Sequence, residues 1–148
     1  AIKIHFKLSE DEIKNKVFEL LEKVELTPPE VFYERHPHEL SGGQQQRVAI
    51  ARAISTEPKL IISDEAVASL DMSIRSEILK LLKKINIETK VSMIMISHDL
   101  SVLKNMCNRI AIMHLGKIVE IGDKEKILGS PQHNYTKKLI SATLEIPN

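Results

Sequence analysis

A short apolar segment that ends in two carboxylates is the feature that most constrains the fold of this chain. Leu60-Ile61-Ile62 runs directly into Ser63-Asp64-Glu65, and a second apolar segment, Met93–Ile96, runs into Ser97-His98. Segments this short and continuously apolar are typical of strands buried on both faces of a sheet. Between them, apolar residues recur at helical spacing over residues 74–85. Strand, helix and strand in this order predict an α/β fold with a largely parallel sheet flanked by helices.

Helices are expected before this sheet and a hairpin after it. Ser9 and Glu12 have the spacing of a capping box, which favours a helix that the prolines at 28–29 stop. The other expected elements are a helix over 44–55, a hairpin with strands over 109–114 and 118–121, and two short helices after residue 123.

Charge and cysteine content exclude several classes of protein. The 148 residues carry 21 Lys and Arg against 20 Asp and Glu, so the net charge of +1 provides no strong field for nucleic acid. The single cysteine, Cys107, excludes an internal disulfide framework. No apolar segment approaches the roughly 18 residues that a membrane-spanning helix needs. The composition therefore favours a globular domain without a nucleic-acid partner.

A glycine pair marks the start of the second helix. In Leu40-Ser41-Gly42-Gly43-Gln44, the two glycines allow backbone N–H groups to approach an anion, and the helix dipole adds partial positive charge there. A plain glycine-rich helix start would explain these residues alone. The segment continues without interruption as Gln45-Gln46-Arg47-Val48-Ala49-Ile50-Ala51-Arg52-Ala53.

Asp64 and Glu65 offer two carboxylates at the end of a strand. Neighbouring strand residues point to opposite faces, so the two groups can take different roles. One can hold Mg²⁺, usually through water, while the other orients the water that attacks in phosphoryl transfer. A strand end that reaches solvent would also carry acidic residues. The pair alone leaves both interpretations open.

His98 follows the second strand. An imidazole at this position can donate a hydrogen bond to a phosphate or to attacking water. The alternative is a structural histidine near a helix start, with Asp99 as the N-cap.

Taken together, these motifs resemble the ATPase subunits of ABC transporters. The segment from Leu40 to Ala53 resembles the signature motif and its helix, and residues 60–65 resemble Walker B. By this resemblance Asp64 is the magnesium-side carboxylate, Glu65 the catalytic carboxylate and His98 the switch histidine. Ser69-Leu70-Asp71 resembles the D-loop, although Ala66 replaces the proline that usually follows the catalytic glutamate.

The resemblance implies a partial P-loop NTPase fold and a shared ATP site. Its three parts are a portion of the helical signature subdomain over 1–57, part of the core sheet over 58–122, and a helical tail over 123–148. Two subunits would pair head-to-tail and enclose ATP and Mg²⁺. Ser41, Gly42, Gly43, Gln44 and Asp71 would then act at the partner's nucleotide.

A P-loop is absent from these residues. A P-loop has the motif Gly-x4-Gly-Lys-Ser/Thr. The only Gly-Lys pair in this sequence is Gly116-Lys117, and Ile118 follows it where the motif requires Ser or Thr. We therefore expect the sequence to be the C-terminal portion of such a subunit, inactive alone.

The tail narrows the resemblance. Pro131-Gln132-His133-Asn134-Tyr135-Thr136 resembles the end of oligopeptide and dipeptide importer ATPases, with Asn134 in place of a proline. The implied protein imports peptides through transmembrane permease subunits, at the cytoplasmic face of the membrane.

Two alternatives stay open. One is a non-transport ABC-type ATPase of DNA repair or chromosome machinery, which would be expected to show long heptads or a basic face. The other is a catalytically silent interaction fragment.

The resemblance also raises a question of sheet completion. In the family, the Walker A strand lies between the strands that correspond to Met93–Ile96 and Arg109–His114. Those two strands could pair directly, the alternating segment Ile2–Phe6 could fill the place as a strand, or copies could exchange strands. We expect association between copies, because it covers open strand edges without changing the topology.

Overall fold

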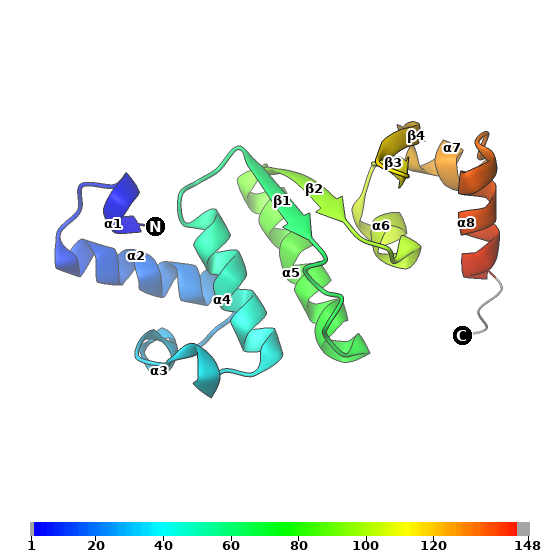
Figure 1. Cartoon of the computed structure of the whole chain (residues 1–148). Helices are drawn as coiled ribbons and strands as arrows, with labels where there is room; N and C mark the ends of the chain where they lie inside the picture. Colours follow the sequence, from blue (N-terminus) through cyan, green and yellow to red (C-terminus); the bar gives the residue numbers. More distant parts are fainter. Residues whose placement is uncertain (1, 145–148) are drawn as a thin grey trace. The chain divides into compact units, whose positions relative to one another are not determined.

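The computed structural model of this protein describes residues 2–144, with only the backbone of residues 3, 4, 143 and 144. Residues 145–148 of the expected tail therefore lie outside the described part. The chain divides into two compact units, Ala1–Ile94 and Met95–Asn148 (Figure 1). Helices and strands alternate along the chain after a helical beginning, so the predicted α/β class is confirmed.

The first unit begins with helices. In chain order these are α1 (Ile2–His5), α2 (Glu10–Lys23), α3 (Pro29–Tyr33), the short 3₁₀ helix η1 (Pro37–Glu39) and α4 (Gly42–Ile54). The predicted capping box starts α2, because the Ser9 N–H donates to Glu12 Oε2 at 2.8 Å and the Glu12 N–H donates to Ser9 Oγ at 3.3 Å. α2 ends before the prolines, in a left-handed turn at Glu25.

The segment Ile2–Phe6 forms a helical turn. The strand that its alternating apolar and polar residues could have formed is not present. The Phe6 N–H donates to the Ile2 carbonyl at 3.0 Å, so the turn satisfies its own backbone. A strand needs a neighbour to do this. The Phe6 ring also lies 4.1 Å from the Lys16 ammonium of α2, which holds the turn beside that helix.

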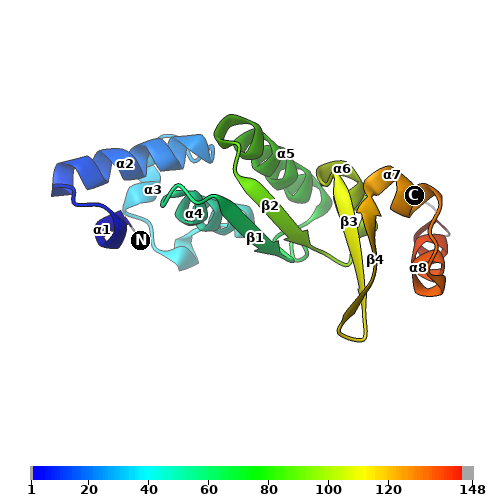
Figure 2. The same ribbon diagram turned by 90° about the horizontal axis from the view of Figure 1, so that it is seen from above.

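A strand–helix–strand unit follows, made of β1 (Leu60–Asp64), α5 (Met72–Thr89) and β2 (Ser92–Ile96). β1 and β2 form a two-stranded sheet and run in the same direction (Figures 1 and 2). α5 is capped at its C-terminal end by Lys90, which adopts the left-handed conformation with φ 54° and donates its N–H to the Asn86 carbonyl at 2.9 Å. This tight end returns the chain directly into β2.

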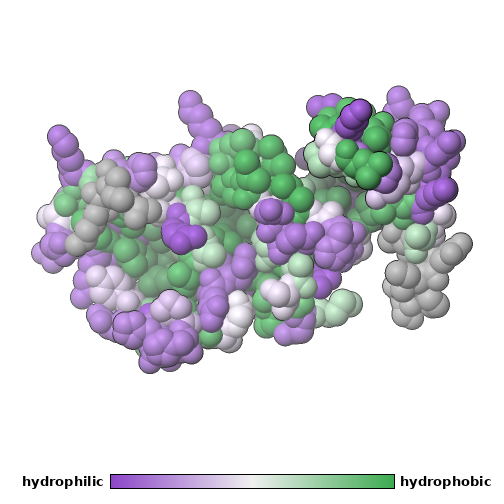
Figure 3. All heavy atoms as spheres, viewed as in Figure 1, coloured by the Kyte–Doolittle hydropathy of each residue, from purple (hydrophilic) through white to green (hydrophobic). Residues whose placement is uncertain are grey.

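The expectation that these strands are buried on both faces is wrong for the described residues. Exposure alternates along each strand, and the side chains of Leu60, Ile62 and Ile94 are 48%, 63% and 49% exposed. Hydrophobic side chains gather over this sheet in Figure 3. α5 lies along the other face with its apolar residues buried, so one helix covers one face and the opposite face stays open. We call Leu60, Ile62 and Ile94 the open sheet face.

The second unit is a helix-flanked hairpin. Its elements are α6 (Leu100–Met106), β3 (Arg109–His114), β4 (Lys117–Asp123), α7 (Lys124–Gly129) and α8 (Asn134–Leu144). β3 and β4 pair antiparallel, as predicted, through a two-residue turn at Leu115 and Gly116. Both turn residues have positive φ, the conformation that a type I′ turn requires.

The core of this unit lies under the hairpin. Ile110, Ile112 and Ile127 are almost fully buried there, and Cys107 contacts the same cluster. Burial raises the pKa of the Cys107 thiol, although Lys124 opposes this shift. The Cys107 side chain is half-buried in this cluster.

We expect the 148-residue chain to self-associate through the open sheet face. β2 and β3 belong to separate two-stranded sheets, and isolated two-stranded sheets are marginally stable in water. The net charge of +1 leaves little repulsion between copies.

Light scattering on the purified chain should give a mass of at least twice the chain's 16.8 kDa. Ile62→Thr with Ile94→Thr should reduce this mass, whereas Ile87→Thr on α5 should not. A stable wild-type monomer at high concentration would contradict the expectation.

Candidate functional site

The loop at Ser41–Gln44 is built by reciprocal capping. Ser41 is the N-cap of α4: its Oγ accepts the Gln44 N–H at 3.3 Å, and its own N–H donates to Gln44 Oε1 at 3.0 Å. The N–H groups of Gly42 and Gly43 lie in the first turn, where a helix offers no internal acceptor. The Ser41 hydroxyl hydrogen and the Gln44 side-chain amide also stay available as donors. The helix start therefore presents several donors suited to an anion.

The two glycines of this loop have different environments. A Cβ on Gly43 would lie 2.7 Å from Ile74 Cγ2, whereas a Cβ on Gly42 would lie 3.6 Å from Leu70 Cδ2. The first distance is a severe overlap, and the Ile74 methyl sits directly on its Cβ, so it cannot move without changing χ1. Gly43 is therefore required by the packing of α4 on α5. Packing within the chain does not require a glycine at Gly42.

Gln45 holds the segment that leads into the loop. Its Nε2 donates to the carbonyls of Pro37 and Leu40 at 2.9 and 3.1 Å. In the same segment, the His36 and His38 rings stack at 5.6 Å with only 4° between their planes. Sequence reasoning did not single out Gln45. The available signal was its place in a run of three glutamines at a helix start.

Asp71 is the N-cap of α5. Its Oδ1 accepts the Ile74 N–H at 3.0 Å and the Ser73 hydroxyl at 2.7 Å, and these two bonds, in that order, lower the pKa of the carboxyl. Leu70 and Ile74 lie next to the glycine pair of α4. The structure thus brings the loop at Ser41–Gln44 beside the segment that contains Asp71, a juxtaposition that spacing alone did not predict.

Asp64 and Glu65 lie in different backbone conformations. β1 ends at Asp64, and Glu65 has φ 47°, in the left-handed region that residues with a Cβ disfavour by roughly 1–2 kcal/mol. The Ala68 N–H donates to the Glu65 carbonyl at 3.1 Å and closes the turn. Glu65 is therefore outside the strand, contrary to the strand alternation that we expected to separate the two carboxylates. Such strained positions concentrate at functional sites.

His98 lies in the turn between β2 and α6, in the second unit. The Asp99 N–H donates to Ser97 Oγ at 3.0 Å, and Asp99 Oδ1 accepts the Ser101 N–H at 2.8 Å. Asp99 is therefore the N-cap of α6, as the structural interpretation expected. The imidazole itself is exposed.

A metal ion at Asp64 would need ligands in addition to the His, Cys, Asp and Glu side chains of the described residues. No group of three or more His, Cys, Asp or Glu side chains in the described part of the chain could hold a metal ion. Mg²⁺ at nucleotide sites is usually held by one or two carboxylates together with phosphate oxygens and water. The exposed carboxylate of Asp64 fits that arrangement.

The tail motif leads from α7 into α8 and is hydrogen-bonded to β4. The Glu120 carboxylate accepts the N–H groups of Gln132 and His133 at 2.8 and 3.1 Å, and Tyr135 stacks on His114 at 3.8 Å. The Thr136 hydroxyl and these N–H groups lower the pKa of Glu120. The residues that sequence analysis used as a subfamily marker therefore dock the tail on the hairpin.

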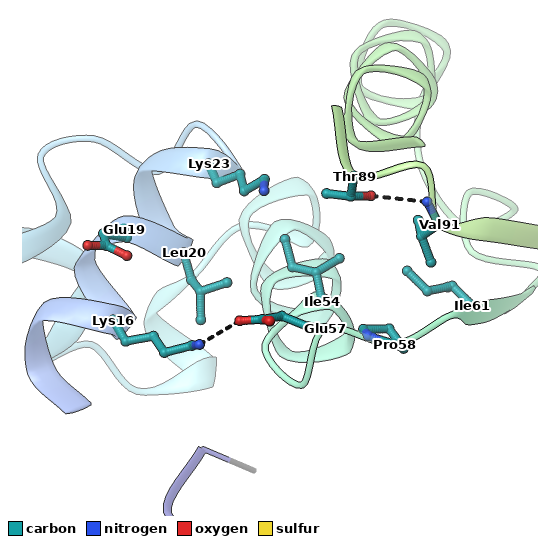
Figure 4. A pocket seen from close by; sticks show the side chains of 10 residues that line it. All are labelled: Lys16, Glu19, Leu20, Lys23, Ile54, Glu57, Pro58, Ile61, Thr89 and Val91. Atoms are coloured by element: carbon teal, nitrogen blue, oxygen red, sulfur yellow. Dashed lines mark hydrogen bonds and ion pairs between the residues drawn. The ribbon is translucent and has the colours of Figure 1, made fainter. Parts of the chain in front are cut away.

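A cavity lies at the opposite end of β1 from Asp64 and Glu65. It has a volume of about 360 Å³ and lies between α2, α4 and the end of α5 (Figure 4). An ion pair of 2.8 Å between Lys16 and Glu57 joins two of its walls, and Lys16 lowers the pKa of Glu57. It contains none of the predicted site residues, so we do not assign the site there.

Comparisons with known proteins agree with the fold and with the family resemblance of the motifs. The family model described as ABC transporter matches residues 2–68. The ATP-binding cassette MJ1267 in its ADP conformation has a TM-score of 0.73 and 27% identity, covering 95% of this chain and 53% of that one. The dimeric post-hydrolysis cassette MJ0796 bound to ADP and Pi has a TM-score of 0.67 and 34% identity, covering 80% and 50%.

The relatives found by sequence are also ATP-binding proteins of transport systems. The Haemophilus influenzae dipeptide transport ATP-binding protein DppF is 44% identical over 140 residues, which are 95% of this chain and 42% of the relative. The Mycoplasma genitalium oligopeptide transport ATP-binding protein OppF is 45% identical, over 95% of this chain and 16% of its own. The Escherichia coli K12 glutathione import ATP-binding protein GsiA is 44% identical, over 95% and 22%.

Over 95% of its length this chain is similar to ATP-binding proteins of ABC-type peptide transport, as the motifs predicted. It spans about two fifths or less of the length of these curated relatives. Within the described residues, no helix is both long and apolar enough to cross a membrane.

Two alanine variants separate the roles of the glycines. Gly43→Ala should destabilise the protein by about 1–3 kcal/mol, because the new methyl group overlaps Ile74. Gly42→Ala should change the free energy of unfolding by less than about 1 kcal/mol, since alanine is favourable in a helix. Urea unfolding of both variants beside the wild type measures this. Equal destabilisation by the two would contradict the packing argument.

Proposed function

We propose that this chain is part of the ATP-hydrolysing subunit of an ABC transporter that imports short peptides. One observation carries the proposal: the donor-rich helix start at Ser41–Gln44 lies beside the segment of Asp71, in a chain that shares 44–45% identity with named peptide-transport ATP-binding proteins. Dipeptides, oligopeptides and glutathione, which these relatives' names specify, are all short peptides. The substrate class of this protein is proposed on that basis.

The carboxylates take the chemical roles. Glu65 orients the attacking water and accepts its proton as a general base. Asp64 would hold Mg²⁺, and the ion would supply positive charge that offsets the charge of the phosphates. His98 donates a hydrogen bond to the γ-phosphate or to the water. The left-handed turn at Glu65 and the exposure of all three side chains support these assignments.

The helix start acts on a nucleotide bound mainly by a second subunit. Ser41, Gly42, Gly43 and Gln44 donate hydrogen bonds to its phosphates, and the dipole of α4 adds partial positive charge. Asp71 contributes at the same interface. The absence of a packing requirement for glycine at Gly42 supports close approach of a ligand there.

The assembly follows from these roles. Two ATP-binding subunits pair head-to-tail, and permease subunits in the membrane carry the peptide, so the subunit works at the cytoplasmic face of the membrane. The three-part division at residues 57 and 122 belongs to the same proposal. A nucleic-acid-dependent ATPase has less support, because the net charge is only +1.

The 148-residue chain alone should hydrolyse ATP no faster than buffer. None of its five glycines completes a P-loop, so its ATP affinity should be very low. Phosphate release measured on the purified chain tests this, and mixing it with a P-loop-containing portion of the subunit should restore turnover. Substantial Mg²⁺-dependent activity of the chain alone would contradict the expectation.

Replacing Glu65 should stop hydrolysis in the intact subunit while leaving ATP binding in place. Glu65→Gln keeps the size of the side chain but removes the charge that accepts a proton, so turnover should fall at least about a hundredfold. Glu88→Gln, at an exposed position of α5, is the matched control and should keep wild-type turnover. Near-normal turnover of Glu65→Gln would move the catalytic role to another residue.

A further inference from the structure

Arg47 connects three helical elements of the first unit. Its Nη1 donates to the Val24 carbonyl at 2.9 Å and to Glu25 Oε2 at 2.7 Å, while its Nη2 donates to Glu77 Oε2 at 3.2 Å. Only 13% of the Arg47 side chain is exposed. One guanidinium on α4 therefore bonds to the end of α2 and to the second turn of α5.

These bonds continue the contact made by the glycine pair. Gly43 and Arg47 are four residues apart on α4, and Ile74 and Glu77 are three residues apart on α5, so each pair lies on one helix face. Gly43 meets Ile74 and Arg47 meets Glu77, one turn further along both helices. Steric contact thus sets the separation of the helices at one point. The ion pair fixes their mutual rotation at the next.

The end of α2 is shaped to receive Arg47. Glu25 has φ 61°, a position where helices usually place glycine, and the Leu26 N–H donates to the Leu21 carbonyl at 2.9 Å across the turn. A side chain at a left-handed position persists where its surroundings hold it. The Glu25 carboxylate contacts Arg47 and, at 3.8 Å, Lys84 of α5. The turn therefore keeps a glutamate for its contacts with cations on two other helices.

We infer that Arg47 is a positioning residue for the loop at Ser41–Gln44, an inference that rests on the proposed function. Arg47 fixes the start of α4 relative to Asp71 and to the end of α2, so that the loop's donors meet the phosphates in one geometry. Lysine replaces it only in part, because a single ammonium does not match the planar fork that reaches a carbonyl and two carboxylates. Arg47 itself touches no substrate in this role.

The test uses the intact subunit, assembled with its partner and permease. Arg47→Ala should lower kcat about 10- to 100-fold, the scale of a small misplacement at a reacting site, and change the KM for ATP by less than about threefold. Arg47→Lys should fall between this variant and the wild type. Arg52→Ala is the matched control, since Arg52 is an exposed arginine on the same helix, and it should keep wild-type kcat.

Two further measurements separate positioning from general stability. Amide hydrogen exchange should become faster at residues 42–46 in Arg47→Ala, and stay at the wild-type rate in Arg52→Ala. Glu77→Gln should lower kcat, and adding it to Arg47→Ala should cause little further loss, as expected for coupled partners. If Arg47→Ala does not fold, kcat and amide exchange at residues 42–46 are measured instead in Arg47→Lys and Glu77→Gln, and compared with Arg52→Ala.

Several outcomes would overturn the inference. They are unchanged kcat per folded Arg47→Ala molecule, a loss of kcat no greater than in Arg52→Ala, or unchanged exchange at residues 42–46. A wild-type assembly without ATPase activity would instead overturn the proposed function. Hydrogen exchange would still decide in that case whether Arg47 positions the loop.

Discussion

The close approach of α4 to α5 at Gly43 and Ile74 is the contact on which the candidate site depends. A Cβ at Gly43 would come within 2.7 Å of the Ile74 methyl, so the helices meet at this distance only because the residue is glycine. The contact places the start of α4 beside the start of α5. Ser41 is the N-cap of α4, and Asp71 is the N-cap of α5. Two helix starts with their partial positive charge therefore lie together in the first unit.

Polar contacts then orient α4 relative to α5, to the end of α2 and to the segment that precedes α4. Arg47 joins α4 to Glu25 and Glu77, and Gln45 ties the preceding segment to the carbonyls of Pro37 and Leu40. Both side chains belong to the same short helix as the glycines. The signature-like segment thus contains its own supports as well as the groups proposed to face ATP. Its sequence is explained partly by packing and partly by function.

The sheet is stabilised from one side. α5 covers one face of β1 and β2, while Leu60, Ile62 and Ile94 stay between 48% and 63% exposed on the other. The strained turn at Glu65 begins where this sheet ends. In the second unit, the hairpin buries its own apolar face under α7 and α8, and the Glu120 carboxylate holds the start of α8. The tail motif therefore has a structural explanation that does not depend on any ligand.

The sequence by itself determined the features whose physical causes are local. The capping box of Ser9 and Glu12, the apolar strands and the turn at Gly116 each depend on neighbouring residues, and all were predicted with bounds close to those observed. The resemblance to ABC transporter ATPases also followed from the sequence, because the motifs occur in the order and spacing of that family. Ile2–Phe6 escaped this reasoning, since its alternation fits a strand but no neighbouring strand pairs with it in the described structure.

Only the tertiary structure decided which distant groups meet. Arg47 reaches Glu25 and Glu77 across 22 and 30 residues, and Glu120 reaches His133 across 13. No periodicity or local propensity encodes such contacts, because they depend on how whole helices approach one another. The same holds for the open sheet face: apolar composition showed that Leu60 and Ile62 can be buried, but burial also requires a second covering layer. The local sequence does not specify such packing partners, so it could not show that one face of these strands stays exposed.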